Sequence, residues 1–282
     1  MAKLSKQQYV AVVAAVLFIV LLVLLPRKVL DKKDIVKDQL EEIDGNHNHE
    51  FTIKSLLQNV PNENLKSQIQ SEYNEYLENG KTNILDTLYY ISYTNNFPEL
   101  AAFFYEEKAL KLKSEDSWLL SGDAFFNAFR YTQHQEFKTI LINKAIESYS
   151  QVLKRNDKNL NAKTGLGVCY VDGSSYLGEP PMRGITLLLE VVKEDSTNLS
   201  ALTNLGYFSI QSGQYEKAKQ RFEQILKIEP KFAEAHLYLT DISLAMGDTI
   251  NAVEHIEKYK SMIENPATKQ QLDEYIKKLL NN

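Results

Sequence analysis

Residues 199–266 contain the same pattern twice in succession. Leu205 of the first copy aligns with Leu239 of the second, and Ala218 aligns with Ala252. The period is about 34 residues, which fits a unit made of two helices joined by a turn. A unit of this size cannot bury its apolar face alone, so successive units must stack. The repeat therefore predicts an all-α solenoid and argues against a globular enzyme.

Turn-forming residues mark the helix ends within the first copy. We predict a first helix over residues 201–211 and a second over residues 215–228. Gly213 follows the first helix, where glycine adopts the left-handed conformation without a steric penalty. Pro230 follows the second helix, which proline cannot continue.

Small and large apolar side chains alternate at fixed offsets in this copy. Gly206 and Ala218 are predicted where the two helices cross, and Phe222 is predicted to fill the gap towards the next unit. These positions resemble those of the tetratricopeptide repeat (TPR) family, and the match is carried by Leu202, Leu205, Gly206, Ala218, Phe222 and Pro230. The resemblance implies a right-handed α-solenoid of helix pairs, and the whole chain looks most like bacterial single-pass, membrane-anchored TPR proteins.

Weaker copies of the pattern extend towards the N-terminus. We predict about five TPR-like units, at residues 82–114, 115–159, 160–198, 199–232 and 233–266. The second unit carries about eleven extra residues, and the third carries an insertion within residues 173–184 that is expected to form a stiff, protruding loop. Residues 267–282 are predicted to form a capping helix whose apolar face contains Leu272, Tyr275, Ile276, Leu279 and Leu280.

Residues 9–25 form an uncharged apolar run. Its length of about 17 residues is near the short end for a transmembrane helix. A cleaved signal peptide would need a small-x-small site after the run, and Pro26, Arg27 and Lys28 stand there instead. A lipoprotein anchor would need a cysteine there. We therefore expect an uncleaved anchor at residues 9–25, preceded by a short tail at residues 1–8.

The orientation of the anchor is less constrained. Basic residues after the span outnumber those before it, which favours a cytoplasmic repeat domain. Short lysine-containing tails, however, usually stay inside while a large domain is exported. We expect a single-pass protein of the cell (inner) membrane, with its TPR domain on the periplasmic or extracytoplasmic side. Residues 26–81 are expected to form a helical stalk or capping segment.

Composition excludes several classes of function. The chain has a net charge of −5, and its first 40 residues carry +4, so the rest is acidic and poorly suited to nucleic acid. The single cysteine, Cys169, rules out an intrachain disulfide and is expected to be a packed thiol. His47 and His49 lack an evident third partner and fit a solvated loop better than a metal site. We expect no cofactor, no metal and no small-molecule substrate.

One further segment resembles a phosphate-binding loop only in part. Gly80, Lys81 and Thr82 are similar to the end of a phosphate-binding loop, but Glu75 occupies the place of the required earlier glycine. No arrangement of catalytic residues is evident from spacing, and the chain is not predicted to be an enzyme.

Recognition of another protein is the remaining function. The resemblance implies that the first helices of the units line a concave groove, where an extended peptide or a partner helix would bind. The predicted groove residues are Asn127, Thr164, Thr203, Asn204, Tyr207, Gln211, Tyr238 and Asp241. We expect a membrane-anchored scaffold for protein–protein interaction in envelope assembly, secretion or complex maturation. Two alternatives stay open: a structural spacer with no groove ligand, and an enzyme or metal protein with an unrecognised site.

Overall fold

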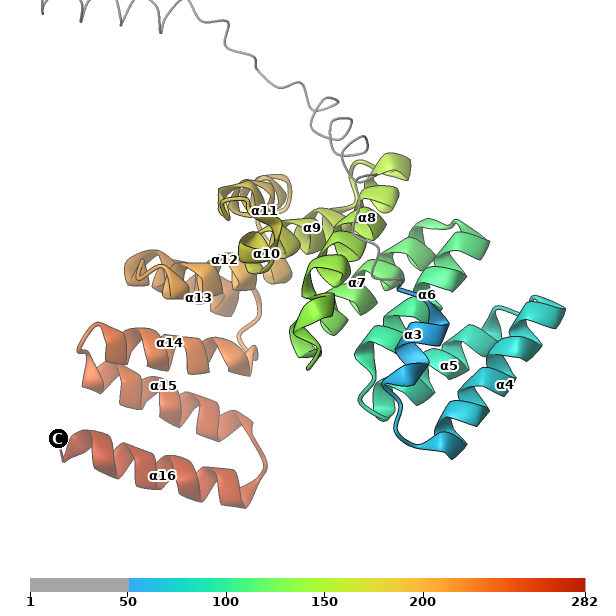
Figure 1. Ribbon diagram of the computed structural model, residues 1–282. Helices are drawn as coiled ribbons and strands as arrows, with labels where there is room; N and C mark the ends of the chain where they lie inside the picture. The colour runs from blue at the N-terminus through green and yellow to red at the C-terminus, as the bar shows by residue number, and fades with distance from the viewer. Residues whose placement is uncertain (1–50, 282) are drawn as a thin grey trace, which may run out of the picture. The chain divides into compact units, whose positions relative to one another are not determined.

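The computed structural model describes residues 51–281, and every regular element in this range is helical (Figure 1). The described residues belong to one compact unit, Glu50–Asn282. Its elements are α3 (Ile53–Gln58), α4 (Glu63–Asn79), α5 (Asn83–Thr94), α6 (Pro98–Leu112), α7 (Glu115–Tyr131), the 3-10 helix η1 (Gln135–Phe137), α8 (Lys138–Arg155), α9 (Leu160–Asp172), α10 (Ser174–Leu177), α11 (Met182–Glu194), α12 (Leu199–Gln211), α13 (Tyr215–Ile228), α14 (Ala233–Ala245), α15 (Thr249–Met262) and α16 (Pro266–Leu280).

The helices form successive pairs. Helix α5 packs on α6, α7 on α8, α9 on α11, α12 on α13, and α14 on α15. Each pair also contacts the next through α6 and α7, α8 and α9, α11 and α12, and α13 and α14. This chain of neighbour contacts, visible in Figure 1, fits the predicted all-α solenoid.

The helix boundaries around α12 and α13 follow local signals. The Asn198 side chain accepts a hydrogen bond from the amide of Ala201, so α12 begins at Leu199, two residues earlier than predicted. Gly213 ends this helix with a φ of 72°, as predicted. Its counterpart Gly247 has a φ of 78° at the end of α14. Glycine thus fixes the turn inside both copies of the repeat.

Phe222 is the central contact of the first copy. Its fully buried ring lies against Gly206, where an added Cβ would be 2.7 Å from the ring. The same ring stacks on Tyr238 of α14, with ring centroids 4.6 Å apart. The predictions that Gly206 allows a close approach and that Phe222 reaches the next unit are therefore confirmed.

A second close approach joins α9 and α11. A Cβ added to Gly184 would lie 2.1 Å from the carbonyl oxygen of Gly167. The two backbones are in contact at this point, so neither helix has room for a side chain there.

The N-terminal part of the described chain is packed on the repeats. Tyr73 of α4 contacts the rings of Phe103 and Phe104 on α6. Before α3, Phe51 contacts the rings of Phe103, Phe125 and Phe137. The predicted stalk at residues 26–81 therefore contributes its last part, from Phe51 onwards, to the core of the repeat array.

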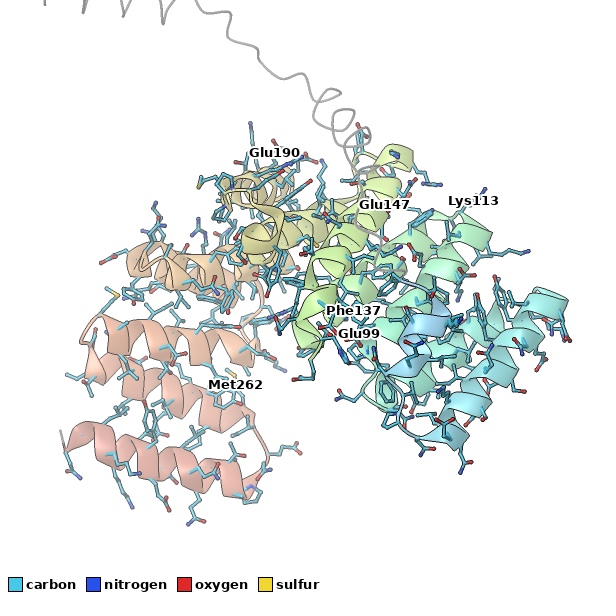
Figure 2. All side chains as sticks on the ribbon, in the orientation of Figure 1. Glu99, Lys113, Phe137, Glu147, Glu190 and Met262 are labelled. Carbon is cyan, nitrogen blue, oxygen red and sulfur yellow. The ribbon has the colours of Figure 1, made fainter. Side chains whose placement is uncertain are left out.

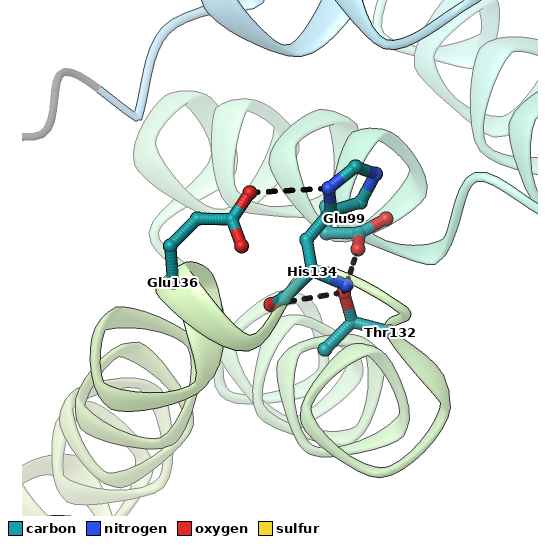
Figure 3. A network of polar contacts seen from close by, with 4 residues as sticks. All are labelled: Glu99, Thr132, His134 and Glu136. Atoms are coloured by element: carbon teal, nitrogen blue, oxygen red, sulfur yellow. Dashed lines mark hydrogen bonds and ion pairs between the residues drawn. The ribbon is translucent and has the colours of Figure 1, made fainter.

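The long connection between α7 and α8 is held by buried polar groups. The Thr132 hydroxyl donates to the carboxylate of buried Glu99, and the His134 amide donates to the Thr132 oxygen at 2.9 Å (Figure 3). The His134 ring then lies 3.1 Å from a carboxylate oxygen of Glu136. Figure 2 labels Glu99 of α6 and Phe137 of η1, the buried polar and aromatic residues of this region. The extra residues of this unit thus form an ordered connection.

Two sequence expectations need correction. The segment at residues 173–184 contains α10, which packs on α8 and α9, and the Tyr176 ring lies edge-on to Phe129 at 5.4 Å. Its later part, including Met182, is exposed, and Tyr176 of α10 also keeps accessible surface. In α16, Ile276 is buried and Leu272 and Leu279 are half-buried, whereas Tyr275 and Leu280 are exposed. Leu272, Ile276 and Leu279 are spaced by four and three residues, which keeps them on one side of the helix. Tyr275 and Leu280 lie beside this side and are therefore more accessible.

Among residues 51–281, no helix has both the length and the hydropathy of a membrane span. The predicted anchor at residues 9–25 lies outside the described residues.

Candidate functional site

Two tyrosines from successive first helices lie together. The ring of Tyr207 on α12 is 6.5 Å from that of Tyr238 on α14, in a T-shaped arrangement. Tyr238 is held in place by its stack on Phe222, and Tyr207 by contact with Phe208. Both are half-buried, so each has a fixed ring and some accessible surface.

The other predicted groove residues differ in accessibility. Gln211 and Asp241 keep accessible surface, although neighbouring groups desolvate the Asp241 carboxyl in part and so raise its pKa. Thr203 and Asn204 are half-buried. The side-chain amide of Asn204 donates a hydrogen bond to the Ser200 carbonyl at 2.8 Å.

Two predicted residues lie on the earlier first helices. Asn127 of α7 is half-buried and keeps accessible surface. Thr164 of α9 is 5% exposed, and its hydroxyl donates to the Leu160 carbonyl at 2.8 Å, so it has almost nothing to offer a partner. We call the remaining set the first-helix face: Asn127, Thr203, Asn204, Tyr207, Gln211, Tyr238 and Asp241.

The carboxylate of Asp123 on α7 is held by a tyrosine of α8. The hydroxyl of Tyr149 on α8 donates to an Asp123 carboxylate oxygen at 2.6 Å. The Tyr149 ring fills the space left by two glycines, since an added Cβ would be 2.7 Å from it at Gly122 and 2.4 Å from it at Gly165. The glycines of α7 and α9 thus create a slot for one buried ring. In the sequence, only Gly122 and Gly165 indicate this slot, and they do not indicate that Tyr149 fills it.

Three stacked tyrosines lie on α5 and α6. Burial raises the pKa of Tyr89, and the charges of Tyr93 and Asp123 raise it further. Tyr89 stacks on Tyr105 with centroids 3.8 Å apart, and it also stacks on Tyr93 at 5.8 Å. Tyr93 is half exposed, so the stack reaches the surface.

Other candidates for chemistry have structural roles. Cys169 is fully buried, as expected of a packed thiol, and burial raises its pKa well above the usual range. Gly80 ends α4 with a φ of 69°, so it is a helix terminator. Within residues 51–281, no three histidine, cysteine or acidic side chains are grouped as metal ligands. His47 and His49 lie outside the described residues.

The remaining histidines include one pair. The Nδ1 atoms of His236 on α14 and His255 on α15 are 3.1 Å apart. Burial lowers the pKa of both, that of His255 to about 4. The pair is therefore neutral at pH 7 and forms a hydrogen bond between the two helices.

Comparison with known proteins supports the repeat assignment. Residues 209–260 match the tetratricopeptide repeat family model. The crystal structure of PilW, a type IV pilus biogenesis factor, is 22% identical and covers 71% of this chain and 86% of its own, with a TM-score of 0.52. This likeness shows a shared TPR-like helical fold. The crystal structure of MamA is 18% identical and covers 61% of this chain and 91% of its own, with a TM-score of 0.44.

One curated sequence is also similar. A probable UDP-N-acetylglucosamine–peptide N-acetylglucosaminyltransferase, SPINDLY of Hordeum vulgare, is 26% identical over 124 residues. The match spans 43% of this chain and only 13% of the barley protein. The similarity thus concerns a small part of a much longer protein.

Proposed function

We propose that this chain is a scaffold that binds another protein through the first-helix face. The observation that carries the proposal is the Tyr207–Tyr238 pair, whose rings are fixed by packing on Phe208 and Phe222 and remain partly accessible. Tyrosine provides a large contact area at a low cost in side-chain entropy, so rings held in this way are good anchors for a partner.

The arrangement of the helices supports an extended binding surface. Helix α9 contacts both α7 and α12, and the two tyrosines connect α12 to α14. The polar members of the face, including Asn127 and Gln211, supply amides that pair with the main chain of a bound segment. An extended peptide or a helix that runs across several first helices would use these groups together.

The proposal includes a membrane anchor at residues 9–25. In this account the anchor holds the scaffold at the inner membrane, with the repeats on the extracytoplasmic side, and raises the effective concentration of a partner near the bilayer. The processes that fit such a scaffold are envelope assembly, secretion or complex maturation.

A crosslinking pull-down tests the proposal. Full-length protein in its membrane is compared with the variant Tyr207→Ala/Gln211→Ala/Tyr238→Ala, after circular dichroism has shown that the variant folds. A matched control changes three exposed residues of α13 instead, Gln220→Ala/Glu223→Ala/Lys227→Ala. The proposal expects a partner that the first variant loses and the control keeps. Identical partners for all three proteins would contradict it.

A further inference from the structure

We propose that Asp123 binds a cationic side chain, lysine or arginine, of the partner that the first-helix face holds. This inference rests on the proposed function and adds the chemical class that the partner must present. Asp123 lies on α7 and is exposed. Tyr149 alone among residues 51–281 forms a hydrogen bond with its carboxylate.

The carboxylate is held in one orientation. The Tyr149 hydroxyl donates to one Asp123 oxygen at 2.6 Å, and the Tyr149 ring is confined between Gly122 and Gly165. A buried tyrosine that cannot move gives the carboxylate a fixed direction. A carboxylate accepts about four hydrogen bonds, so most of its capacity remains for a ligand.

The surroundings of Asp123 favour a positive ligand. Partial burial raises the pKa of Asp123, and the hydrogen bond from Tyr149 offsets part of this effect. Asp172 on α9 is a second acidic group whose charge acts on the same thiol, since burial and then the charges of Asp172 and Asp123 raise the pKa of Cys169. A carboxylate that is partly desolvated and lacks a paired cation gains more from a charged donor than one in water.

Arg130, which follows Asp123 on α7 by seven residues, is engaged elsewhere. The Arg130 side chain is 4.0 Å from the Asp172 carboxylate and lies over the Phe126 ring. It therefore balances Asp172, and Asp123 has no ion-pair partner among the described residues. The local charge is negative, which repels an acidic ligand and attracts a basic one.

Aromatic rings complete the site. Burial, and then the charges of Tyr93 and Asp123, raise the pKa of Tyr89, whose ring stacks on those of Tyr93 and Tyr105. Lysine and arginine combine a charged end with an apolar stem, and aromatic faces bind both parts. The Asp123 carboxylate and the tyrosines whose pKa it influences are thus suited to these side chains more than to a neutral amide.

The test uses peptides selected on the protein itself. A library of random dodecapeptides is panned on the full-length chain in detergent micelles, and the Kd of fluorescein-labelled selected peptides is measured by anisotropy. We expect a lysine or arginine at a shared position. We also expect Asp123→Asn to weaken binding about tenfold, since this isosteric change removes the charge and leaves an acceptor for Tyr149. Asp157→Asn, at an exposed aspartate in the turn before α9, is the matched control and should bind as wild type.

A double-mutant cycle assigns the contact. Replacing the shared basic residue of the peptide with methionine should weaken binding to wild type about tenfold and binding to Asp123→Asn hardly at all. Tyr149→Phe should raise the pH at which affinity is half lost, because it removes the hydrogen bond that lowers the pKa of Asp123. Selected peptides without a shared basic residue, or equal affinities for Asp123→Asn and Asp157→Asn, would overturn the inference.

The Tyr207/Gln211/Tyr238 triple variant separates this inference from the proposed function. Peptides that require these residues but not Asp123 would overturn the inference and support the function. Peptides that require Asp123 but bind the triple variant as well as wild type would support the inference and contradict the proposed extent of the face. Failure to select any peptide would overturn both.

Discussion

Replacing Gly184 with alanine should destabilise the protein by about 2 kcal/mol, although alanine is the better helix former. The added Cβ would lie 2.1 Å from the Gly167 carbonyl oxygen, 2.7 Å from a Val171 methyl carbon and 3.0 Å from the Val171 amide nitrogen. Two of these three atoms belong to the backbone of α9, which cannot rotate away as a side chain can. Helices α9 and α11 must therefore separate by about 1 Å to reach ordinary contact distance.

The magnitude follows from two opposing effects. Overpacking of a tight contact costs about 1–3 kcal/mol, and a clash with backbone belongs at the upper end of that range. Replacing glycine with alanine inside a helix recovers about 1 kcal/mol. The net loss of about 2 kcal/mol would lower the midpoint of urea unfolding with little change in its slope.

The assay is urea unfolding of the full-length chain in detergent, followed by circular dichroism at the helical band. Thr186→Ala is the control, since Thr186 is an exposed residue of the same helix and reports the gain in helix propensity without the clash. A Gly184→Ala variant at least as stable as wild type would refute the inferred backbone contact between α9 and α11.

Three further predictions concern stability. Phe222→Ala should cost about 3–5 kcal/mol in the free energy of unfolding, because it empties a fully buried site between two units; thermal unfolding measures this. Phe51→Ala should cost about 2 kcal/mol by removing contacts with three rings and with the Lys144 ammonium 5.6 Å away; an unchanged urea midpoint would show that this segment is not part of the core. Stability should fall as the pH drops from about 6.5 to about 4, because the unfolded state protonates its histidines before the buried pair His236 and His255 does; a His255→Phe variant with an unchanged pH slope would contradict this.

The clear repeats were predictable because their signals are local. Gly213 and Pro230 bracket α13, and its predicted range agrees with the observed Tyr215–Ile228. The role of Phe222 also followed from the repeat period, since each unit must bury its apolar face against the next.

Contacts between distant residues were less accessible to sequence reasoning. Phe51 precedes α3, a helix of six residues that is too short for a helical period to be recognised, so no pattern in the sequence predicted the packing of Phe51. The Asp123–Tyr149 hydrogen bond joins residues on two helices, and no repeat offset specifies it. For Thr164 the repeat pattern predicted the wrong role. Its position in the repeat predicts a groove residue, but its hydroxyl donates a hydrogen bond to the Leu160 carbonyl of its own helix.

The measurement that tests the central claim most directly is site-specific photocrosslinking in cells. One full-length variant carries a photoreactive amino acid at Gln211, on the first-helix face, and a second carries it at Gln220, an exposed position of α13. The account predicts a defined protein adduct from position 211 and none from position 220. The same adducts from both positions, or an adduct from position 220 alone, would contradict binding through the first-helix face.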